Sequence, residues 1–303
     1  MTRHLGLSAV AAAICIVVGL HIAGDVQARP TTVADLLAAT SPKDWRRPDP
    51  DSTLYLQLSS GRVIIELAPR VAPHHVANIK ALIRAHYFDG LAILRVQDNY
   101  VVQWADPGTH RPVPGGVTLV APELTADPGA YGHFEPLPDH DLYAAQVGFI
   151  DGFPAGRDPR SHTTWLAHCY GMVGVGRDDA AESDGTEMYA VIGNAPRHLD
   201  RNVALVGRVL QGVELLSSLP RGSGEMGFYV KPEPLVPIVS MRLATDVPEA
   251  SRVPIEVLRT DSEAFRKITD QLRNRRDDWF KYHPGRIDLC SIPLPVRPAP
   301  PGR

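Results

Sequence analysis

The order of apolar and polar residues first becomes regular near residue 54, where it predicts a β-hairpin. Every second residue from Leu54 to Leu58 is apolar, Ser59-Ser60-Gly61 supply a turn, and a second apolar run extends from Val63 to Leu67. The period then lengthens to that of a helix, since the apolar residues after Pro73 are Val76, Ile79, Leu82 and Ile83. Pro73 itself suits the first turn of a helix. We therefore expect a hairpin followed by an amphipathic helix.

A second strand pair is expected in the stretch FDGLAILRVQDNYVVQWADP, residues 88–107. The apolar runs LAILRV and YVVQWA lie on either side of Gln-Asp-Asn, and each contains one polar residue, Arg95 or Gln103. Alternate side chains of a strand point to opposite faces, so either residue could face solvent or a ligand. The pattern alone favours an Arg95 side chain that faces solvent, with its aliphatic stem packed on its neighbours.

The rest of the chain continues as short apolar runs separated by polar turns. Strands are expected in WLAHCYGMVGVG and TEMYAVIG, from Val203 to Val209 and from Ile238 to Ala244, with a short helix from Val213 to Leu219. Residues 107–162 hold many Pro, Gly and His residues and no long period, which predicts a large loop insertion. Many short strands with two helices are typical of a closed antiparallel β-barrel capped by helices, a mainly-β fold.

A C-terminal helical extension is expected to follow the barrel over residues 246–303. The helix is predicted from Asp261 to Phe280, because Thr260 and Glu263 resemble a capping box. Its apolar stripe would be formed by Phe265, Ile268, Leu272 and Trp279. Arg273, Arg275 and Arg276 are interpreted as a solvated face of the same helix.

Composition narrows the classes of partner. The chain has 303 residues, of which 44% are hydrophobic and 21% charged, and its net charge is −3. These values are typical of a globular protein and give no electrostatic footprint for nucleic acid or an anionic membrane. The 28 Pro and 25 Gly residues favour many turns and short strands over a helical bundle.

The first 28 residues are typical of a secretory signal peptide. Arg3 and His4 form a basic start, the segment from Leu5 to Gly24 is apolar, and Val26-Gln27-Ala28 provides small residues for cleavage. The alternative is an uncleaved membrane anchor, since the apolar run is about as long as a short spanning helix. Cys15 lies inside the run, which argues against a lipoprotein site. The sequence predicts a periplasmic protein without a membrane span after cleavage, with residues 29–51 as a polar lead-in linker.

Removal of the signal peptide would leave two cysteines, Cys169 and Cys290. An oxidising compartment favours a disulfide between paired cysteines. The alternative is that Cys169 is a small buried strand residue and Cys290 a free thiol. Spacing alone does not decide between them.

Several polar clusters suggest other chemistry but fit no established pattern. His133, Asp139-His140-Asp141, His162 and His168 have no spacing typical of metal ligands, so we interpret these histidines as solvated loop residues. The segment GVGRDD lacks the full glycine fingerprint of a nucleotide site. We expect no metal and no cofactor.

Four motifs, in order, resemble those of the cyclophilin-type peptidyl-prolyl cis-trans isomerase family. They are the stretch at residues 88–107, followed by GMVGVG, GTEMYAVIG and LDRNVALVGRVLQGVELL. The resemblance extends over residues 52–245 once the insertion at about 107–162 is allowed for. It implies a cyclophilin-like barrel that rotates X–Pro bonds in proline-containing polypeptides. Such an enzyme would assist the folding of exported proteins, where slow proline steps limit folding, and we expect it to be a monomer.

The resemblance assigns roles to the two polar strand residues. Amide resonance gives the X–Pro bond a rotation barrier of about 20 kcal/mol. Arg95 stands at the family's catalytic arginine, which donates to the prolyl nitrogen and weakens that resonance. Gln103 stands at the glutamine that bonds the substrate carbonyl. This catalysis is electrostatic and acts mainly in the transition state.

The resemblance also places a proline pocket. Tyr100, Val101, Tyr189 and Leu199 would form its wall, and the backbone of Gly174 would pair with the extended substrate. Several positions depart from the family: Glu187 stands for a glutamine, His198 for a tryptophan, Leu94 for a histidine and Val203 for another histidine. The departures at Leu94, Glu187 and Val203 favour an alternative from another class, a non-catalytic peptide-binding or scaffold module that uses the same groove. Arg95 together with Gln103 favours the enzyme.

Overall fold

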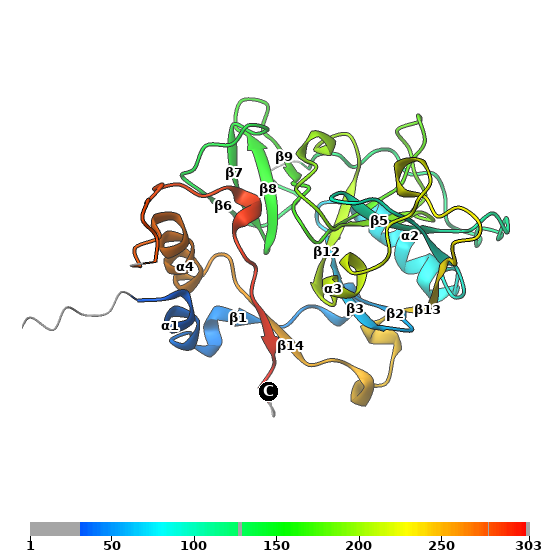
Figure 1. The fold of residues 1–303 in the computed structure, drawn as a ribbon, viewed down its shortest axis with the longest axis horizontal. Helices are drawn as coiled ribbons and strands as arrows, with labels where there is room; N and C mark the ends of the chain where they lie inside the picture. The colour runs from blue at the N-terminus through cyan, green and yellow to red at the C-terminus, as the bar shows by residue number, and fades with distance from the viewer. Residues whose placement is uncertain (1–30, 127–128, 278, 301–303) are drawn as a thin grey trace, which may run out of the picture. The chain divides into compact units, whose positions relative to one another are not determined.

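The computed structural model describes residues 31–126, 129–277 and 279–300. A closed β-barrel is the largest sheet of the described chain (Figure 1). Its strands are β2 (Thr53–Leu58), β3 (Gly61–Leu67), β4 (Ala92–Val96), β5 (Val101–Ala105), β10 (Met172–Val175), β11 (Met188–Val191), β12 (Leu205–Gln211) and β13 (Val236–Leu243). They follow one another around the barrel as β10-β11-β5-β4-β13-β2-β3-β12, and all the pairs are antiparallel. The expected mainly-β barrel is confirmed.

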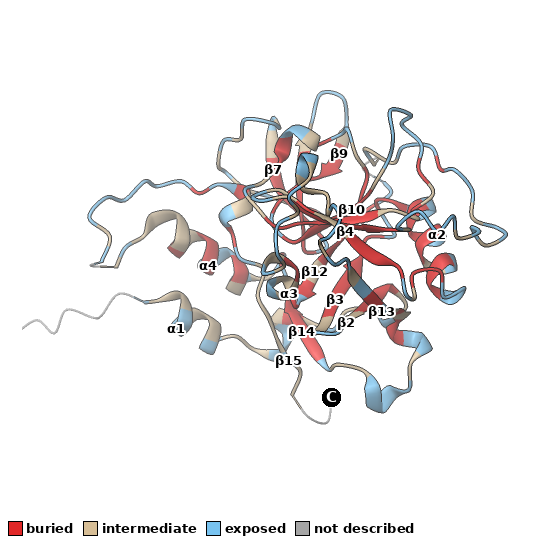
Figure 2. Cartoon of the chain, turned by 45° about the vertical axis from the view of Figure 1, so that its right-hand side comes forward, coloured by how far each residue is buried: buried red, intermediate tan, exposed pale blue. Residues whose placement is uncertain are grey.

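The barrel interior is apolar because alternate residues of each strand point inward. Leu54, Leu56 and Leu58 of β2 belong to this core, which is continuous with the buried face of helix α2 (Pro73–Arg84). Figure 2 shows the buried strands of the barrel in red. Pro73 lies in the first turn of α2, as the sequence predicts, and the second helix is α3 (Val213–Ser217). No helix in the described part of the chain is long and apolar enough to cross a membrane.

The segment expected to be a loop contains strands, so that prediction was wrong. Three strands lie within residues 107–162: β6 (Phe134–Pro136), β7 (Gln146–Ile150) and β8 (Phe153–Asp158). Together with β9 (Thr163–Leu166), which follows this segment, they form a four-stranded antiparallel sheet. Glycines inside these strands hid the pattern. An added Cβ at Gly156 would lie 2.7 Å from the Trp165 ring, and at Gly148 it would lie 2.1 Å from the Glu135 carbonyl oxygen. These glycines permit close packing rather than marking turns.

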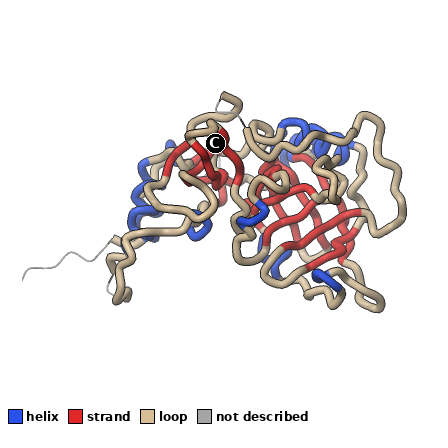
Figure 3. Tube along the Cα trace, turned by 90° about the horizontal axis from the view of Figure 1, so that it is seen from above, coloured by secondary structure: helices blue, strands red, loops and turns tan. Residues whose placement is uncertain are grey.

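The lead-in segment is not a linker either. It contains α1 (Val33–Ala38) and β1 (Trp45–Arg46), and β1 pairs with β14 (Ile255–Leu258), which in turn pairs with β15 (Val296–Pro298). Residues that precede and follow the barrel segment in the sequence thus build one three-stranded sheet. All strands are drawn in red in Figure 3. A second apolar cluster joins Trp45, Phe265 and Ile268 to Phe149 and Phe153 of the insertion.

The C-terminal helix is shorter than predicted. Helix α4 spans Glu263–Asn274, its N-cap is Ser262, and Arg275 ends it in the left-handed conformation at φ 48°. Phe265 and Ile268 are buried, but Trp279 lies beyond the helix and is 79% exposed, so it is not part of the stripe. Arg273 does not belong to a solvated face, because it pairs with the buried Asp139 carboxylate at 2.7 Å.

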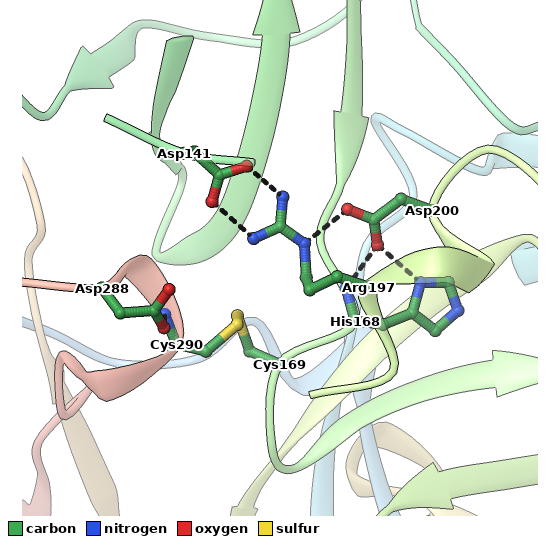
Figure 4. The surroundings of a disulfide bond; sticks show 7 residues. All are labelled: Asp141, His168, Cys169, Arg197, Asp200, Asp288 and Cys290. Atoms are coloured by element: carbon green, nitrogen blue, oxygen red, sulfur yellow. Dashed lines mark hydrogen bonds and ion pairs between the residues drawn. A yellow bond between two sulfur atoms is a disulfide. The ribbon is translucent and has the colours of Figure 1, made fainter. Parts of the chain in front are cut away.

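A disulfide bond joins Cys169 to Cys290, with their Cα atoms 4.9 Å apart (Figure 4). Cys169 lies between β9 and β10, and Cys290 lies in the short 3-10 helix η7 (Leu289–Ser291). The remaining 3-10 segments are η1 (Pro42–Asp44), η2 (Pro50–Ser52), η3 (Arg197–Leu199), η4 (Glu225–Gly227), η5 (Ala244–Asp246) and η6 (Glu249–Ser251). The bond therefore connects the C-terminal extension to the barrel region. The predicted signal peptide lies outside the described residues.

Candidate active site

Arg95 and Gln103 face each other across the strand pair β4–β5. They are register partners, and a shift in the register lies between Ile93 and Arg95. Such an irregularity re-aims a side chain, which accounts for a polar residue that interrupts the apolar run. The Arg95 Nη1 donates to the Gln103 Oε1 at 3.1 Å. The two polar residues singled out in the sequence thus meet at one place on the barrel surface.

The Arg95 guanidinium is held by further contacts on several sides. Its Nε donates to the Met226 carbonyl oxygen at 2.7 Å, and its Nη2 donates to the Gln97 side chain. The rings of Tyr100 and Phe228 lie 5.5 Å and 5.4 Å from it. Burial lowers the pKa of Arg95 from its usual value, while Tyr100 and Glu187 oppose that change. An arginine remains charged in such surroundings, so the site contains a fixed cation.

A pocket of about 260 Å³ opens beside this guanidinium. It is lined by Arg95, Tyr100, Val101, Gln103, Gly176, Arg177, Tyr189, Leu199 and Val203. Six of the predicted site residues therefore share one cavity. Gly176, Arg177, Met226 of η4 and the adjacent Phe228 were not predicted. Gly176 ends the GMVGVG motif, but the resemblance assigns it no role, and Phe228 comes from a segment without regular pattern.

Glu187, His198 and Gly174 surround this pocket without lining it. Glu187 accepts a hydrogen bond from the Gln103 Nε2. The exposed His198 ring stacks on Tyr100, with ring centres 6.1 Å apart. Gly174 is the register partner of Tyr189, and a Cβ added there would lie 2.3 Å from the Tyr189 ring. Gly174 therefore makes room for the ring that closes the pocket.

The electrostatics of these neighbours differ. Burial raises the pKa of the Glu187 carboxyl, although the hydrogen bond from Gln103 opposes this. Burial also raises the pKa of the Tyr100 and Tyr189 phenols, so both remain neutral at physiological pH. The residues that line the pocket thus include two arginines, Arg95 and Arg177, one amide and two uncharged phenols.

His168 is not a solvated loop residue, contrary to our prediction. Its side chain is fully buried, and its ring bonds to Asp200 and Tyr189, each at 2.9 Å. Asp139 and Asp141 pair with arginines instead of forming a metal cluster. Among the described residues, no group of three or more His, Cys, Asp or Glu side chains is placed to hold a metal ion.

Known proteins resemble this chain over the segment that forms the barrel. The family model described as "Cyclophilin type peptidyl-prolyl cis-trans isomerase/CLD" matches residues 53–243. A probable peptidyl-prolyl cis-trans isomerase of Brucella suis is 26% identical over 189 residues, covering 62% of this chain and 82% of the relative. The human peptidyl-prolyl cis-trans isomerase-like 1 is 32% identical over 184 residues, covering 60% of this chain and 84% of the relative.

One solved structure is similar to this chain over the barrel and also over residues outside it. The cyclophilin AquaCyp293 from Hirschia baltica is 25% identical and has a TM-score of 0.69. The similarity covers 88% of this chain and 98% of that protein, and so extends beyond the segment that the family model matches.

Proposed function

Since the chain belongs to the cyclophilin-type peptidyl-prolyl cis-trans isomerase family, we propose that it rotates X–Pro bonds in the pocket beside Arg95. The observation that carries this assignment is the convergence of the Arg95 guanidinium and the Gln103 amide on one small cavity. Val101, Leu199 and the Tyr189 ring offer the apolar wall that a proline ring requires.

The proposed chemistry needs neither a nucleophile nor a proton transfer. Each terminal nitrogen of Arg95 carries a second N–H group beyond the one that bonds to Gln103 or Gln97. We assign one of these groups to the prolyl nitrogen, whose lone pair becomes available as the amide twists. Donation to that lone pair favours the twisted form over the planar one. Gln103 would bond the substrate carbonyl and hold the peptide in place.

Substitution of Arg95 tests this assignment. We expect Arg95→Ala to lower kcat/KM for an Ala-Pro peptide by roughly tenfold to a thousandfold, because one transition-state donor is lost. Cis/trans exchange measured by NMR gives the rate, and the thermal midpoint reports on the fold. Arg259→Ala is the matched control, because that exposed arginine pairs with its neighbour Asp261 in the C-terminal extension.

The same spectra distinguish the enzyme from a binding module. Full exchange catalysis by Arg95→Ala would remove Arg95 from the mechanism. If the peptide resonances shift on binding to the wild type but cis/trans exchange is not faster, the non-catalytic module is favoured. The Glu187 carboxyl at the pocket edge is the structural feature that supports this alternative.

We further propose that the protein is exported to the periplasm, where it assists the folding of other exported chains. The apolar N-terminal segment and the small residues before Arg29 support export, and the Cys169–Cys290 disulfide suits an oxidising compartment. Cell fractionation with N-terminal sequencing tests the proposal. A processed chain that begins near Arg29 in the periplasm is expected, and an unprocessed chain in the cytoplasm would contradict it.

A further inference from the structure

A chain of buried polar side chains leads from the pocket to the insertion. The Tyr189 hydroxyl and the His168 Nε2 are 2.9 Å apart, and the His168 Nδ1 lies 2.9 Å from the Asp200 Oδ1. The other oxygen of Asp200 accepts from the Arg197 Nε at 2.6 Å. The Arg197 fork then donates to both oxygens of Asp141, at 2.9 Å and 3.0 Å (Figure 4). We call these five residues the Tyr189–Asp141 chain.

This chain is shielded from water. The exposed fraction of the side chain is 0% for His168, 4% for Asp200 and Asp141, and 5% for Arg197. Burial lowers the pKa of His168, so the ring is neutral at physiological pH. Burial opposes ionisation of Asp200, but the hydrogen bond from His168 and the charge of Arg197 together hold its pKa below the usual value. The neutral His168 ring and the Arg197 guanidinium therefore both lie next to an ionised carboxylate, Asp200, that can accept hydrogen bonds from them.

The direction of each hydrogen bond is fixed by this ionised carboxylate. A carboxylate can only accept, so the His168 Nδ1 must carry the proton and donate to Asp200. The His168 Nε2 is then an acceptor, and the Tyr189 hydroxyl must donate to it. Tyr189 is thus anchored at its hydroxyl by His168, while its ring packs over the backbone of Gly174.

The far end of the chain is equally well fixed. Asp141 lies between β6 and β7, in the insertion, and its Oδ1 also accepts from the backbone N–H groups of Tyr143 and Ala144, at 2.8 Å and 2.9 Å. The Arg197 guanidinium lies 5.2 Å from the centre of the Tyr143 ring. Arg197 is held between two carboxylates, one from the insertion and one from its own turn, and the same turn carries Leu199 of the pocket wall.

We propose that the Tyr189–Asp141 chain holds the ring of Tyr189 in place as the wall of the proline pocket, which makes Asp141 of the insertion a positioning residue for isomerisation. The inference rests on the proposed assignment of the pocket beside Arg95. A ring that is fixed before the substrate arrives loses less freedom on binding, so the pocket is preorganised. A phenylalanine would lack the hydroxyl by which this anchoring works.

The test is a double-mutant cycle between Asp141 and Tyr189, two residues linked through the three others of the chain. We expect Asp141→Asn and Tyr189→Phe each to lower kcat/KM for an Ala-Pro peptide by about twofold to tenfold, a range typical of coupling through a packed network. The loss should fall mainly on KM, because the ring contacts the bound proline. In the double variant the loss should not exceed that of the more severe single variant.

Asp139→Asn is the matched control. Asp139 belongs to the same loop, its side chain is 4% exposed as well, and it also pairs with an arginine, Arg273 of α4. Its substitution should lower the thermal midpoint to a similar degree and combine additively with Tyr189→Phe. Additive losses for Asp141→Asn and Tyr189→Phe would overturn the inference and leave Asp141 with a purely structural role.

A spectroscopic measurement keeps the test independent of the rates. The ¹⁵N chemical shifts of the His168 ring should show a protonated Nδ1 and an accepting Nε2 in the wild type. Asp141→Asn should shift the His168 Nε2 and Tyr189 ring resonances, and Asp139→Asn should leave them in place. If the resonances stay unchanged in Asp141→Asn, Asp141 does not hold Tyr189 through the Tyr189–Asp141 chain. This result does not depend on where the substrate binds, so it is distinguishable from a failure of the Arg95→Ala prediction.

Discussion

Glu187 places a carboxyl group at the edge of a pocket that is lined by two arginines, an amide and uncharged side chains. Burial raises its pKa, the hydrogen bond from Gln103 opposes this, and the negative charges of Asp178 and Asp184 add to it. A carboxyl whose pKa is higher in the folded than in the unfolded state destabilises the fold once it ionises. The free energy of unfolding therefore carries a term that decreases as the pH rises from about 4.5 through the raised folded value.

Replacement of this carboxyl should remove that pH dependence. We expect Glu187→Gln to unfold at higher denaturant concentration than the wild type at neutral pH, with the difference shrinking toward pH 4. Urea unfolding across this pH range provides the measurement. Glu182→Gln is the control, because Glu182 is an exposed residue that also lies shortly before strand β11. A difference that stays constant with pH would show that ionised Glu187 carries no such cost.

Some residues of the site could be predicted from the sequence, and others could not. Arg95, Tyr100, Val101 and Gln103 lie within one β-hairpin, formed by β4, β5 and the turn between them, so a local motif could predict that they meet. His168 is different, because its partners Tyr189 and Asp200 are 21 and 32 positions away and reach it only through the folded barrel. Nothing in the flanking residues indicates burial of that ring. The sequence therefore predicted the edge of the pocket but not what supports it.

At the level of elements, the strands with clean alternation were predicted and those with internal glycines were not. The hairpin of β2 and β3 follows its apolar pattern from Leu54 to Leu67. Gly148, Pro154 and Gly156 interrupt the pattern of β7 and β8, although both are regular strands. Strand β1 is only two residues long and pairs with Leu258 and Val257, far along the chain. Its formation depends on that distant partner, which no local pattern reveals.

The disulfide connects two of these elements and should contribute to stability. It closes a loop with a sequence separation of 121 residues between the β9–β10 turn and η7. The chain-entropy model allows a contribution of up to about 4–5 kcal/mol for a loop of this order. We expect reduction, or the paired substitution Cys169→Ser with Cys290→Ser, to lower the urea midpoint.

A reductant added to the doubly substituted chain is the control and should have no effect. Free thiols counted on the denatured, unreduced protein provide a second readout. If both cysteines titrate in the denatured, unreduced protein, or if reduction leaves the midpoint unchanged, the stabilising role is wrong.

At the scale of the whole molecule, the insertion and the flanks are tied to the barrel by a few specific contacts. Glu123 of the insertion accepts from the backbone N–H groups of His74 and His75 at the start of α2, at 3.0 Å and 2.9 Å. Asp141 reaches Arg197 beside the pocket, and Asp139 reaches Arg273 of α4. The added segments are therefore ordered parts of the fold, in keeping with the similarity to the Hirschia baltica cyclophilin over 88% of the chain.

The central claim is that the proline of the substrate binds beside Arg95. A second cavity of about 290 Å³, lined in part by Arg46, Val71 and Phe153, offers a competing location. Intermolecular nuclear Overhauser effects between an Ala-Pro peptide and methyl-labelled protein measure the location directly. We predict contacts from the proline ring to the methyl groups of Val101 and Leu199. Contacts to Val71 instead, with none to Val101 or Leu199, would contradict the account.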